Sequence, residues 1–301
     1  MKKAIPCLLI TYNRLDYAFE LFQIIVANGA DNIYVAIDGG RDFSMRTLQS
    51  NFIAKINSFS IKKNIRVTIW WRDENFGLAN SMTSAIDWFF ENESKGIILE
   101  DDLLPTRDFF EYCEEALENF ENISSVWSIS GNIFGANQHD VCSTSNYPLV
   151  WGWATWSDRW HSYRSSKQMI NNSELSGYIP IRVRMFWKSG ELRVQGNTLN
   201  SWAVPFAARS RRENGIHIHP SFDLVRNRGV SSDATHTKDI SDIPIMKFGE
   251  YSTNSLVNID FSLETRKKNN SYLEKRIFRI KRRHAFSTLK FRIFLLKEYY
   301  L

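Results

Sequence analysis

The chain has 301 residues, of which 43% are hydrophobic and 14% aromatic, and this composition excludes intrinsic disorder and suits a sizeable globular core. Its three cysteines, Cys7, Cys113 and Cys142, are scattered and odd in number, which argues against a disulfide framework and for a reducing compartment. No stretch reaches the roughly 18 apolar residues of a membrane-spanning helix. The apolar start contains Pro6 and no cleavage-like site, so it predicts a buried strand rather than a signal peptide.

The net charge of +5 is unevenly distributed. Residues 266–301 hold twelve Lys or Arg against two Glu, a charge of +10, which leaves about −5 for residues 1–265. Apolar residues of this tail recur at near-helical spacing: Leu273, Ile277, Ile280, Leu289, Ile293 and Leu296. The pattern predicts a basic amphipathic helix on an anionic membrane surface. A helix packed on the body or on a partner is the alternative, and nucleic acid is not expected because no nucleic-acid-binding motif accompanies the tail.

Strands and helices alternate over the first ~130 residues. Strands are predicted at 4–13, 32–38, 64–73, 96–102 and 126–134, and helices at 14–30, 76–92 and 106–120. This order predicts a mostly parallel sheet covered on both faces, with ligands beyond the carboxyl ends of its strands. The polar clusters "TYNR", "DGGRD", "RDENFG" and "EDDL" follow those strands. After residue 140 the alternation stops and the chain becomes rich in Trp, Asn and Ser.

The acids Glu100, Asp101 and Asp102 end the fourth predicted strand. Successive strand residues point to opposite faces, so the three cannot all meet one ion while the strand stays regular. Asp102, nearest the turn, is the first candidate for a metal ligand, and hard oxygen donors favour Mg²⁺ or Mn²⁺ completed by substrate phosphate. A hydrated strand end without metal is the alternative.

The four clusters, in this order at strand ends, resemble the nucleotide-sugar half of GT-A glycosyltransferases, in particular N-acetylglucosaminyltransferase I and its bacterial relatives. The resemblance runs from about Pro6 to Thr237 and includes the later segments "WGWATW" and "DATHT". It implies a Rossmann-like GT-A domain over residues 1–265, with a nucleotide-sugar half at 1–135 and an acceptor half at 136–265, followed by the basic tail 266–301.

The resemblance also implies roles for individual residues. The nucleoside, base, ribose and diphosphate would be bound by Thr11, Tyr12, Asn13, Arg14, Asp38, Gly39, Arg72, Asn75 and Gly77. Asp102 would hold the metal, supported by Glu100 and Asp101, with His236 as a second ligand. The sugar or acceptor would lie near Trp151, Gly152, Trp153 and Trp202. Taken singly, each of these residues also suits a turn, a cap or the core, and two or three of Trp151, Trp153, Trp156 and Trp160 are expected to be structural.

Relatives tend to carry an acid directly after the tryptophan that corresponds to Trp202. An inverting enzyme needs a base there to deprotonate the acceptor hydroxyl. Here that position is Ala203, which accepts no proton. Three explanations stay open: an Asp or Glu replaced by Ala to trap substrate, another acid such as Asp223 or Asp233, or binding without turnover. His217 and His219 alternate on one strand face and are predicted to be structural.

The resemblance and the basic tail together imply a metal-dependent hexosyl- or N-acetylhexosaminyltransferase that uses a UDP- or dTDP-sugar. Its acceptor would be a glycan or lipid-linked molecule of bacterial surface polysaccharide (O-antigen, capsule or lipooligosaccharide), with inversion expected, on the cytoplasmic face of the membrane. A non-catalytic nucleotide-sugar-binding scaffold is the alternative. A sugar nucleotidyltransferase is disfavoured because no Gly-rich phosphate loop precedes Arg and Lys near the N-terminus.

Overall fold

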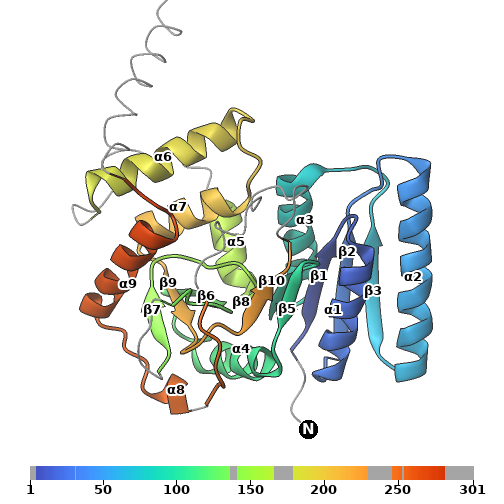
Figure 1. Cartoon of the computed structure of the whole chain (residues 1–301), viewed down its shortest axis with the longest axis horizontal. Helices are drawn as coiled ribbons and strands as arrows, with labels where there is room; N and C mark the ends of the chain where they lie inside the picture. Colours follow the sequence, from blue (N-terminus) through green and yellow to red (C-terminus); the bar gives the residue numbers. More distant parts are fainter. Residues whose placement is uncertain are drawn as a thin grey trace, which may run out of the picture.

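An eight-stranded sheet in the order β3-β2-β1-β4-β8-β6-β9-β7 forms the centre of the protein and is flanked by helices (Figure 1). The computed structural model describes residues 5–30, 32–135, 141–165, 179–229, 246–252 and 254–281. The α/β architecture predicted from the sequence, a large, partly parallel, Rossmann-like sheet between helices, is confirmed.

The parallel half of the sheet consists of β1 (Cys7–Thr11), β2 (Asn32–Ile37), β3 (Arg66–Trp71) and β4 (Lys95–Glu100). β1 pairs with both β2 and β4, and Thr11 lies opposite Ile37 while Ile10 lies opposite Glu100. Because the four strands run in the same direction, the loops that follow them meet at one edge of the sheet.

Both faces of this half are covered, because alternate strand residues enter different apolar clusters. Leu9 and Ile97 pack in the cluster that contains α1 (Leu15–Ala27), α2 (Phe43–Lys63) and α4 (Arg107–Asn119). Leu8 and Ile98 pack in the cluster that contains α3 (Gly77–Asn92) and α5 (Ser157–Ser165).

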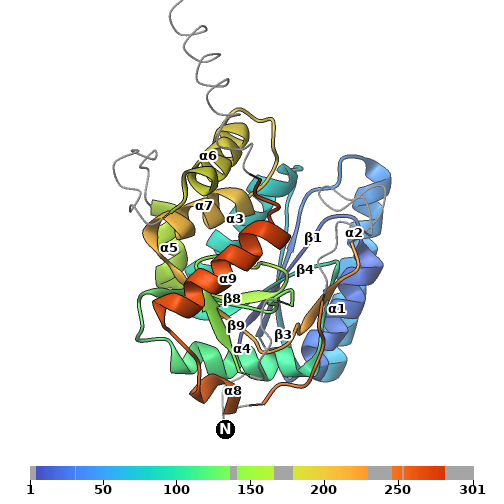
Figure 2. The same ribbon diagram turned by 60° about the vertical axis from the view of Figure 1, so that its left-hand side comes forward.

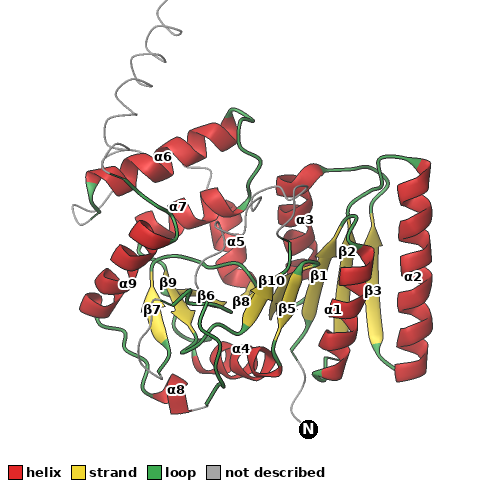
Figure 3. Ribbon diagram, in the orientation of Figure 1, coloured by secondary structure: helices red, strands yellow, loops and turns green. Residues whose placement is uncertain are grey.

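The second half of the sheet mixes directions. β8 (Trp153–Trp156) runs antiparallel between β4 and β6 (Val126–Ser130), and β9 (Ile216–His219) and β7 (Ser143–Ser145) complete the sheet. A separate antiparallel pair joins β5 (Leu103–Pro105) to β10 (Val225–Asn227). The helices α6 (Ile181–Gln195), α7 (Ala203–Glu213) and α9 (Leu263–Arg276) gather on this side, with α8 (Asn254–Val257) below them (Figures 2 and 3).

The helix α2 is absent from the sequence prediction. Of its 21 residues only Gln49, Phe52, Ile56 and Ser60 are buried, and two of these are polar, so its apolar stripe is too thin for a periodicity argument. By contrast, α1 ends as predicted: Gly29 follows the last turn with a φ of +87°, a left-handed conformation that glycine adopts without a Cβ penalty.

The two histidines of β9 are structural, as predicted. His217 is buried between the hydroxyls of Ser128 and Ser210, and burial lowers its pKa well below the usual range. His219 bonds to Ser145 and to the carbonyl of Asn132, and burial lowers its pKa to about 4. Both rings are therefore neutral members of the core at pH 7.

The helix α9 corrects the prediction of a separate tail from residue 266. Leu273 and Ile280 are buried in an apolar cluster with Trp187 of α6, and Ile277 packs against it. Apolar residues expected to face a membrane therefore face the protein, and the folded body extends to residue 281. The rest of the tail, residues 282–301, lies outside the described residues. No helix in the described ranges is long and apolar enough to cross a membrane.

Side-chain amides of α9 also hydrogen-bond the backbone of the edge strand β7 and the residue after it. Asn269 Nδ2 donates to the carbonyl of Thr144 at 2.9 Å, and Asn270 Oδ1 accepts from the backbone N–H of Asn146 at 2.8 Å. One turn further, the carboxylate of Glu274 accepts a hydrogen bond from the Tyr147 hydroxyl at 2.9 Å and lies 3.4 Å from Arg211 of α7. These contacts fix α9 to both the sheet and α7.

Replacement of Glu274 by alanine should destabilise the protein by about 3 kcal/mol, because it leaves the buried Arg211 guanidinium without its counter-charge. Urea unfolding of Glu274→Ala against the wild type measures the loss. Glu264→Ala, an exposed carboxylate in the first turn of the same helix, is the matched control and should cost less than about 1 kcal/mol. Equal losses in the two variants would contradict the role given to the buried pair.

Candidate functional site

A cleft of about 620 Å³ opens at the carboxyl ends of the parallel strands and is bounded on its other side by the start of α7. Most residues predicted for the site line it: Thr11, Tyr12, Asn13, Arg14, Asp38, Asn75, Gly77, Glu100, Asp101, Asp102, Trp151, Trp202 and Ala203. Residues from Ile10 to Gly229, 219 positions apart in sequence, thus line one cavity, as the order of the strands predicts for the loops of the parallel half.

The acids at the end of β4 are held by the last residues of β1 and by Arg14, which follows that strand. Thr11 Oγ1 donates to Asp101 Oδ2 at 2.8 Å, and the Asp101 amide donates to the carbonyl of Ile10 at 3.1 Å. Arg14 Nη1 lies 2.6 Å from Asp102 Oδ2 and 3.8 Å from Asp101 Oδ1. The strand register therefore sets Arg14 directly against the acids.

One guanidinium is insufficient for three carboxylates. Burial and the neighbouring acids raise the pKa of Glu100 and raise the pKa of Asp101 to about 7, while burial raises the pKa of Asp102 despite the Arg14 contact. Such shifts mean that the negative charge of the cluster is under-compensated. A bound cation would remove this imbalance.

The donor set fits a hard divalent cation of the Mg²⁺ or Mn²⁺ kind, which prefers carboxylate oxygens and keeps positions for water and phosphate. Within the described ranges, no group of three or more His, Cys, Asp or Glu side chains is placed to hold a metal. The acids therefore suit an ion held by one or two carboxylates and completed by a ligand, rather than a cage made by the protein alone.

Asp38 has a structural task that the sequence did not reveal. Its Oδ1 accepts from the Phe76 amide at 2.8 Å, and its Oδ2 accepts from the Asn75 side chain at 3.0 Å and the Gly77 amide at 3.2 Å. Since a carboxylate offers about four acceptor positions, little capacity is left for a base. Asp38 lines the cleft, yet its contacts fix the loop before α3.

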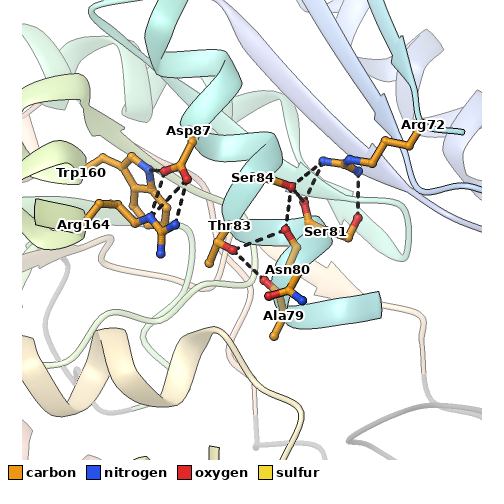
Figure 4. A network of polar contacts seen from close by, with 9 residues as sticks. All are labelled: Arg72, Ala79, Asn80, Ser81, Thr83, Ser84, Asp87, Trp160 and Arg164. Atoms are coloured by element: carbon orange, nitrogen blue, oxygen red, sulfur yellow. Dashed lines mark hydrogen bonds and ion pairs between the residues drawn. The ribbon is translucent and has the colours of Figure 1, made fainter. Parts of the chain in front are cut away.

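Arg72 does not face the cleft, which corrects the prediction that it borders the ribose and diphosphate. Its guanidinium donates to the hydroxyls of Ser81 and Ser84 and to the Ser81 carbonyl (Figure 4). The same group stacks on the Trp70 ring, 4.1 Å from its centroid. Farther along α3, Asp87 accepts from Trp160 and Arg164 of α5 (Figure 4), so the helix is anchored from two sides.

Two predicted glycines serve close packing rather than ligand contact. A Cβ on Gly39 would lie 2.5 Å from the backbone of Glu74, and a Cβ on Gly152 would lie 2.8 Å from Val225 Cγ2. Gly39 thus lets two cleft loops touch, and Gly152, at a φ of +67°, turns the chain tightly beside Val225. Neither lines the cleft.

The tryptophan-rich segment divides as expected. Trp153, Trp156 and Trp160 are buried, and Trp153 stacks on Trp202 with centroids 5.7 Å apart. Trp153 is therefore a core residue that supports the cleft from behind, which corrects its predicted sugar contact. Trp151 and Trp202 line the cleft themselves.

Asp223 does not serve as a base in this geometry. Its carboxylate is fully buried and accepts from the backbone amides of Ile133, Phe134 and Lys247. Ala203 does line the cleft at the predicted place. The other candidates, Asp233 and His236, lie outside the described residues, although Gly229, the last described residue before them, is beside Asp102.

Sequence reasoning missed several contributors. Gln49 of α2 is buried and connects the loops after β1 and β2 to the end of β3: its Nε2 donates to the carbonyls of Tyr12 and Asp38, and its Oε1 accepts from Gly40 N and Trp71 Nε1. Arg41 adds a second guanidinium to the cleft wall, beside Tyr12. A glutamine on a weakly amphipathic helix gives no signal of this role.

The β5–β10 pair adds another wall to the cleft. It brings Asn227 and Gly229 to the acids, and the Arg228 amide donates to the carbonyl of Asp102 at 2.8 Å. A Cβ at Gly229 would lie 2.0 Å from Asp102 Oδ2, so any larger residue there would have to displace the Asp102 carboxylate. The segment "RNRG" was the sequence feature that could have indicated this wall, since a glycine after a short strand often marks a place where another segment approaches the backbone closely.

No protein-family model matches the chain, and no curated protein matches it in sequence. Among solved structures, the chain is similar to two of the glycosyltransferase GlyE from Streptococcus pneumoniae TIGR4, the apo form among them, both at 11% identity with TM-scores of 0.34 and 0.35. These matches cover 79% and 92% of this chain but only 57% and 64% of the GlyE chains.

The chain is also similar to a putative glucose-1-phosphate thymidylyltransferase from Bacillus anthracis, at 9% identity and a TM-score of 0.34, over 70% of this chain and 96% of that one. TM-scores this low carry no argument about substrate or reaction. The function has to be argued from the site.

Asp38→Asn should destabilise the protein by about 1–3 kcal/mol, because an amide nitrogen would then face backbone and side-chain donors of residues 75–77. The midpoint and slope of urea unfolding give the change. Asp73 lies on the loop between β3 and α3, which Asp38 holds, and its side chain is fully exposed. Asp73→Asn should therefore stay within about 0.5 kcal/mol of the wild type. An Asp38→Asn variant as stable as Asp73→Asn would refute the proposal that Asp38 fixes the loop before α3.

Proposed function

We propose that the protein is a GT-A-type glycosyltransferase that binds a nucleotide-diphosphate sugar in this cleft. The observation that carries the proposal is the convergence of the Thr11–Arg14, Asp38, Asn75–Gly77 and Glu100–Asp102 segments on one cavity at the carboxyl edge of the sheet. A volume of about 620 Å³ suits a ligand of nucleotide-sugar size.

The charges of the cleft suit a diphosphate accompanied by a metal. Asp102, with Glu100 beside it, would hold Mn²⁺ or Mg²⁺, which when bound supplies Lewis-acid stabilisation of a departing nucleoside diphosphate. Arg14 and Arg41 offer guanidinium groups to phosphate oxygens. The N-terminus of α3 at Gly77 also borders the cleft, but the Asp38 carboxylate already accepts from the amides of Phe76 and Gly77, so the phosphates are left to the arginines and the metal.

The sugar end of the donor would lie toward Trp151 and Trp202, whose indole rings suit the apolar face of a hexose. An acceptor hydroxyl would approach from the side of Ala203. Since Asp223 is engaged in backbone hydrogen bonds, Asp233 is the sequence's remaining candidate for the base of an inverting reaction. A UDP- or dTDP-linked hexose or N-acetylhexosamine and a bacterial surface-glycan acceptor complete the proposal.

Calorimetric titration with nucleoside diphosphates and nucleotide sugars, each with and without Mn²⁺, tests the donor site. The wild type should bind a uridine or thymidine diphosphate more tightly with Mn²⁺. Asp102→Ala should lose at least about tenfold in that affinity, because it removes a carboxylate that the ion and its phosphates need. Glu264→Ala, on α9 outside the cleft, should bind as the wild type does.

Three other results would point elsewhere. No binding to any nucleotide would refute the glycosyltransferase. Consumption of a nucleoside triphosphate with a sugar phosphate would identify a nucleotidyltransferase. Donor binding without release of nucleoside diphosphate, even with Ala203→Asp and a panel of acceptors, would identify a binding scaffold.

The basic residues 282–301 support a further part of the proposal, peripheral attachment to the cytoplasmic face of a membrane. Deletion from residue 266 would remove α9 and unfold the body, so point changes are needed. Lys290→Gln, Arg292→Gln and Lys297→Gln together should weaken binding to phosphatidylglycerol vesicles about 100-fold, at about 1 kcal/mol per charge. Lys55→Gln, Lys62→Gln and Lys63→Gln on the exposed side of α2 are the control, and equal effects would refute attachment through the tail.

A further inference from the structure

A second hollow, of about 440 Å³, adjoins the cleft. It lies among α6, α7, the segment 148–151 and the residues 277–278 that follow α9, elements that gather on one side of the molecule (Figure 2). Val150, Trp151 and Ala203 line both cavities. The two cavities therefore lie next to each other on either side of these three residues.

The lining of this apolar pocket differs sharply from that of the cleft. Most of its lining is aliphatic or aromatic and includes Met185, Phe186, Leu199 and Phe278. The polar side chains of the lining are the hydroxyl of Ser189 and the guanidinium of Arg193. Several of these residues are only half-buried, so apolar surface is left in contact with water. Such a concave surface binds apolar groups because it gains free energy when water is displaced.

Small residues on α7 keep the pocket open. Ala203 and Ala207 are one helical turn apart and both line it, so neither fills the space toward α6. The helices touch at Gly190, where a Cβ would lie 2.8 Å from Val204 Cγ1. Beyond that contact the two alanines leave a gap.

The frame of the pocket is fixed by the buried polar network described above. Glu274 holds Arg211 of α7 and Tyr147, and Trp187 Nε1 of α6 donates to the Tyr147 hydroxyl at 3.3 Å. All three helices around the hollow are thus tied to one point. The hollow is built into the fold and cannot simply close by collapse of α6 onto α7.

We propose that this apolar pocket binds the non-sugar part of the acceptor, an alkyl or prenyl chain, while the sugar of the acceptor lies in the cleft beside Ala203. The inference rests on the proposed function, and continuity through the wall of Val150, Trp151 and Ala203 selects the occupant. The inference also explains why position 203 carries alanine instead of the acid found in relatives. A carboxylate at position 203 would put a charge where an apolar chain passes from one cavity to the other.

Butyl, hexyl and octyl β-D-glucosides, each below its micellar concentration, serve as probes in calorimetric titrations of the full chain. Affinity should rise about tenfold for each two methylene groups buried. Ser189→Trp and Ala207→Phe, which fill the pocket, should abolish the gain from hexyl to octyl. Gln195→Trp, an exposed position of α6 outside the pocket, should retain it, and a nucleoside diphosphate titration confirms that each variant keeps an intact cleft.

Equal chain-length dependence in Ser189→Trp, Ala207→Phe and wild type would overturn the inference, because the glucosides would then bind elsewhere. Octyl glucoside binding that appears only after Leu295→Asp and Leu296→Asp would also overturn it, by assigning the pocket to the chain's own C-terminal residues. Absence of nucleotide binding, with octyl glucoside binding still sensitive to Ser189→Trp, would instead refute the glycosyltransferase. The two failures are therefore distinguishable.

Discussion

Three consecutive carboxylates at the end of β4 share one guanidinium, and the organisation of the cleft follows from how that charge is held. β1 is the strand that makes this possible, because it pairs with β4 on one side and β2 on the other. Its last residue orients Asp101, and Arg14, three residues on, meets Asp102. Burial and mutual repulsion raise the pKa values of these carboxylates, and the metal proposed above would supply the missing positive charge.

The surrounding loops are tied by buried polar side chains rather than by apolar contact. Asp38 holds residues 75–77, Gln49 joins the loops after β1 and β2 to the end of β3, and Arg72 fastens α3. Their hydrogen bonds go to backbone groups and to the side chains of Asn75, Trp71, Ser81 and Ser84, so these three residues position the cleft loops.

The first half of the fold could be predicted because its strands are continuous apolar runs and its helices α1, α3 and α4 have clear apolar faces. Most of the second half could not, apart from the strand β6 and the two alternating histidines of β9. β7 and β9 are three or four residues long and contain serines and histidines, and α7 buries Arg209 and Arg211. These residues are stable inside only because distant partners satisfy them, and such partners are invisible to periodicity.

The site shows the same division. Strand order placed the polar clusters at one edge, so their meeting was predictable, whereas the direction of each side chain was not. Arg72, Asp223 and Trp153 have the right chemistry and neighbourhood for a ligand, yet each points into the protein. The β5–β10 wall depends on a pairing between residues more than a hundred positions apart, which no local pattern encodes.

The amide contacts between α9 and β7 have a consequence for biosynthesis. β7 is the last strand of the sheet, and until α9 emerges its outer edge has nothing to occupy the carbonyl of Thr144 or the N–H of Asn146. An exposed strand edge is a template for pairing with other chains. A nascent polypeptide that lacks Asn269 and Asn270 would carry that open edge, so protection of the sheet during synthesis depends on α9. The helix α9 thereby covers the edge of β7 and keeps the sheet from pairing with other copies of the chain.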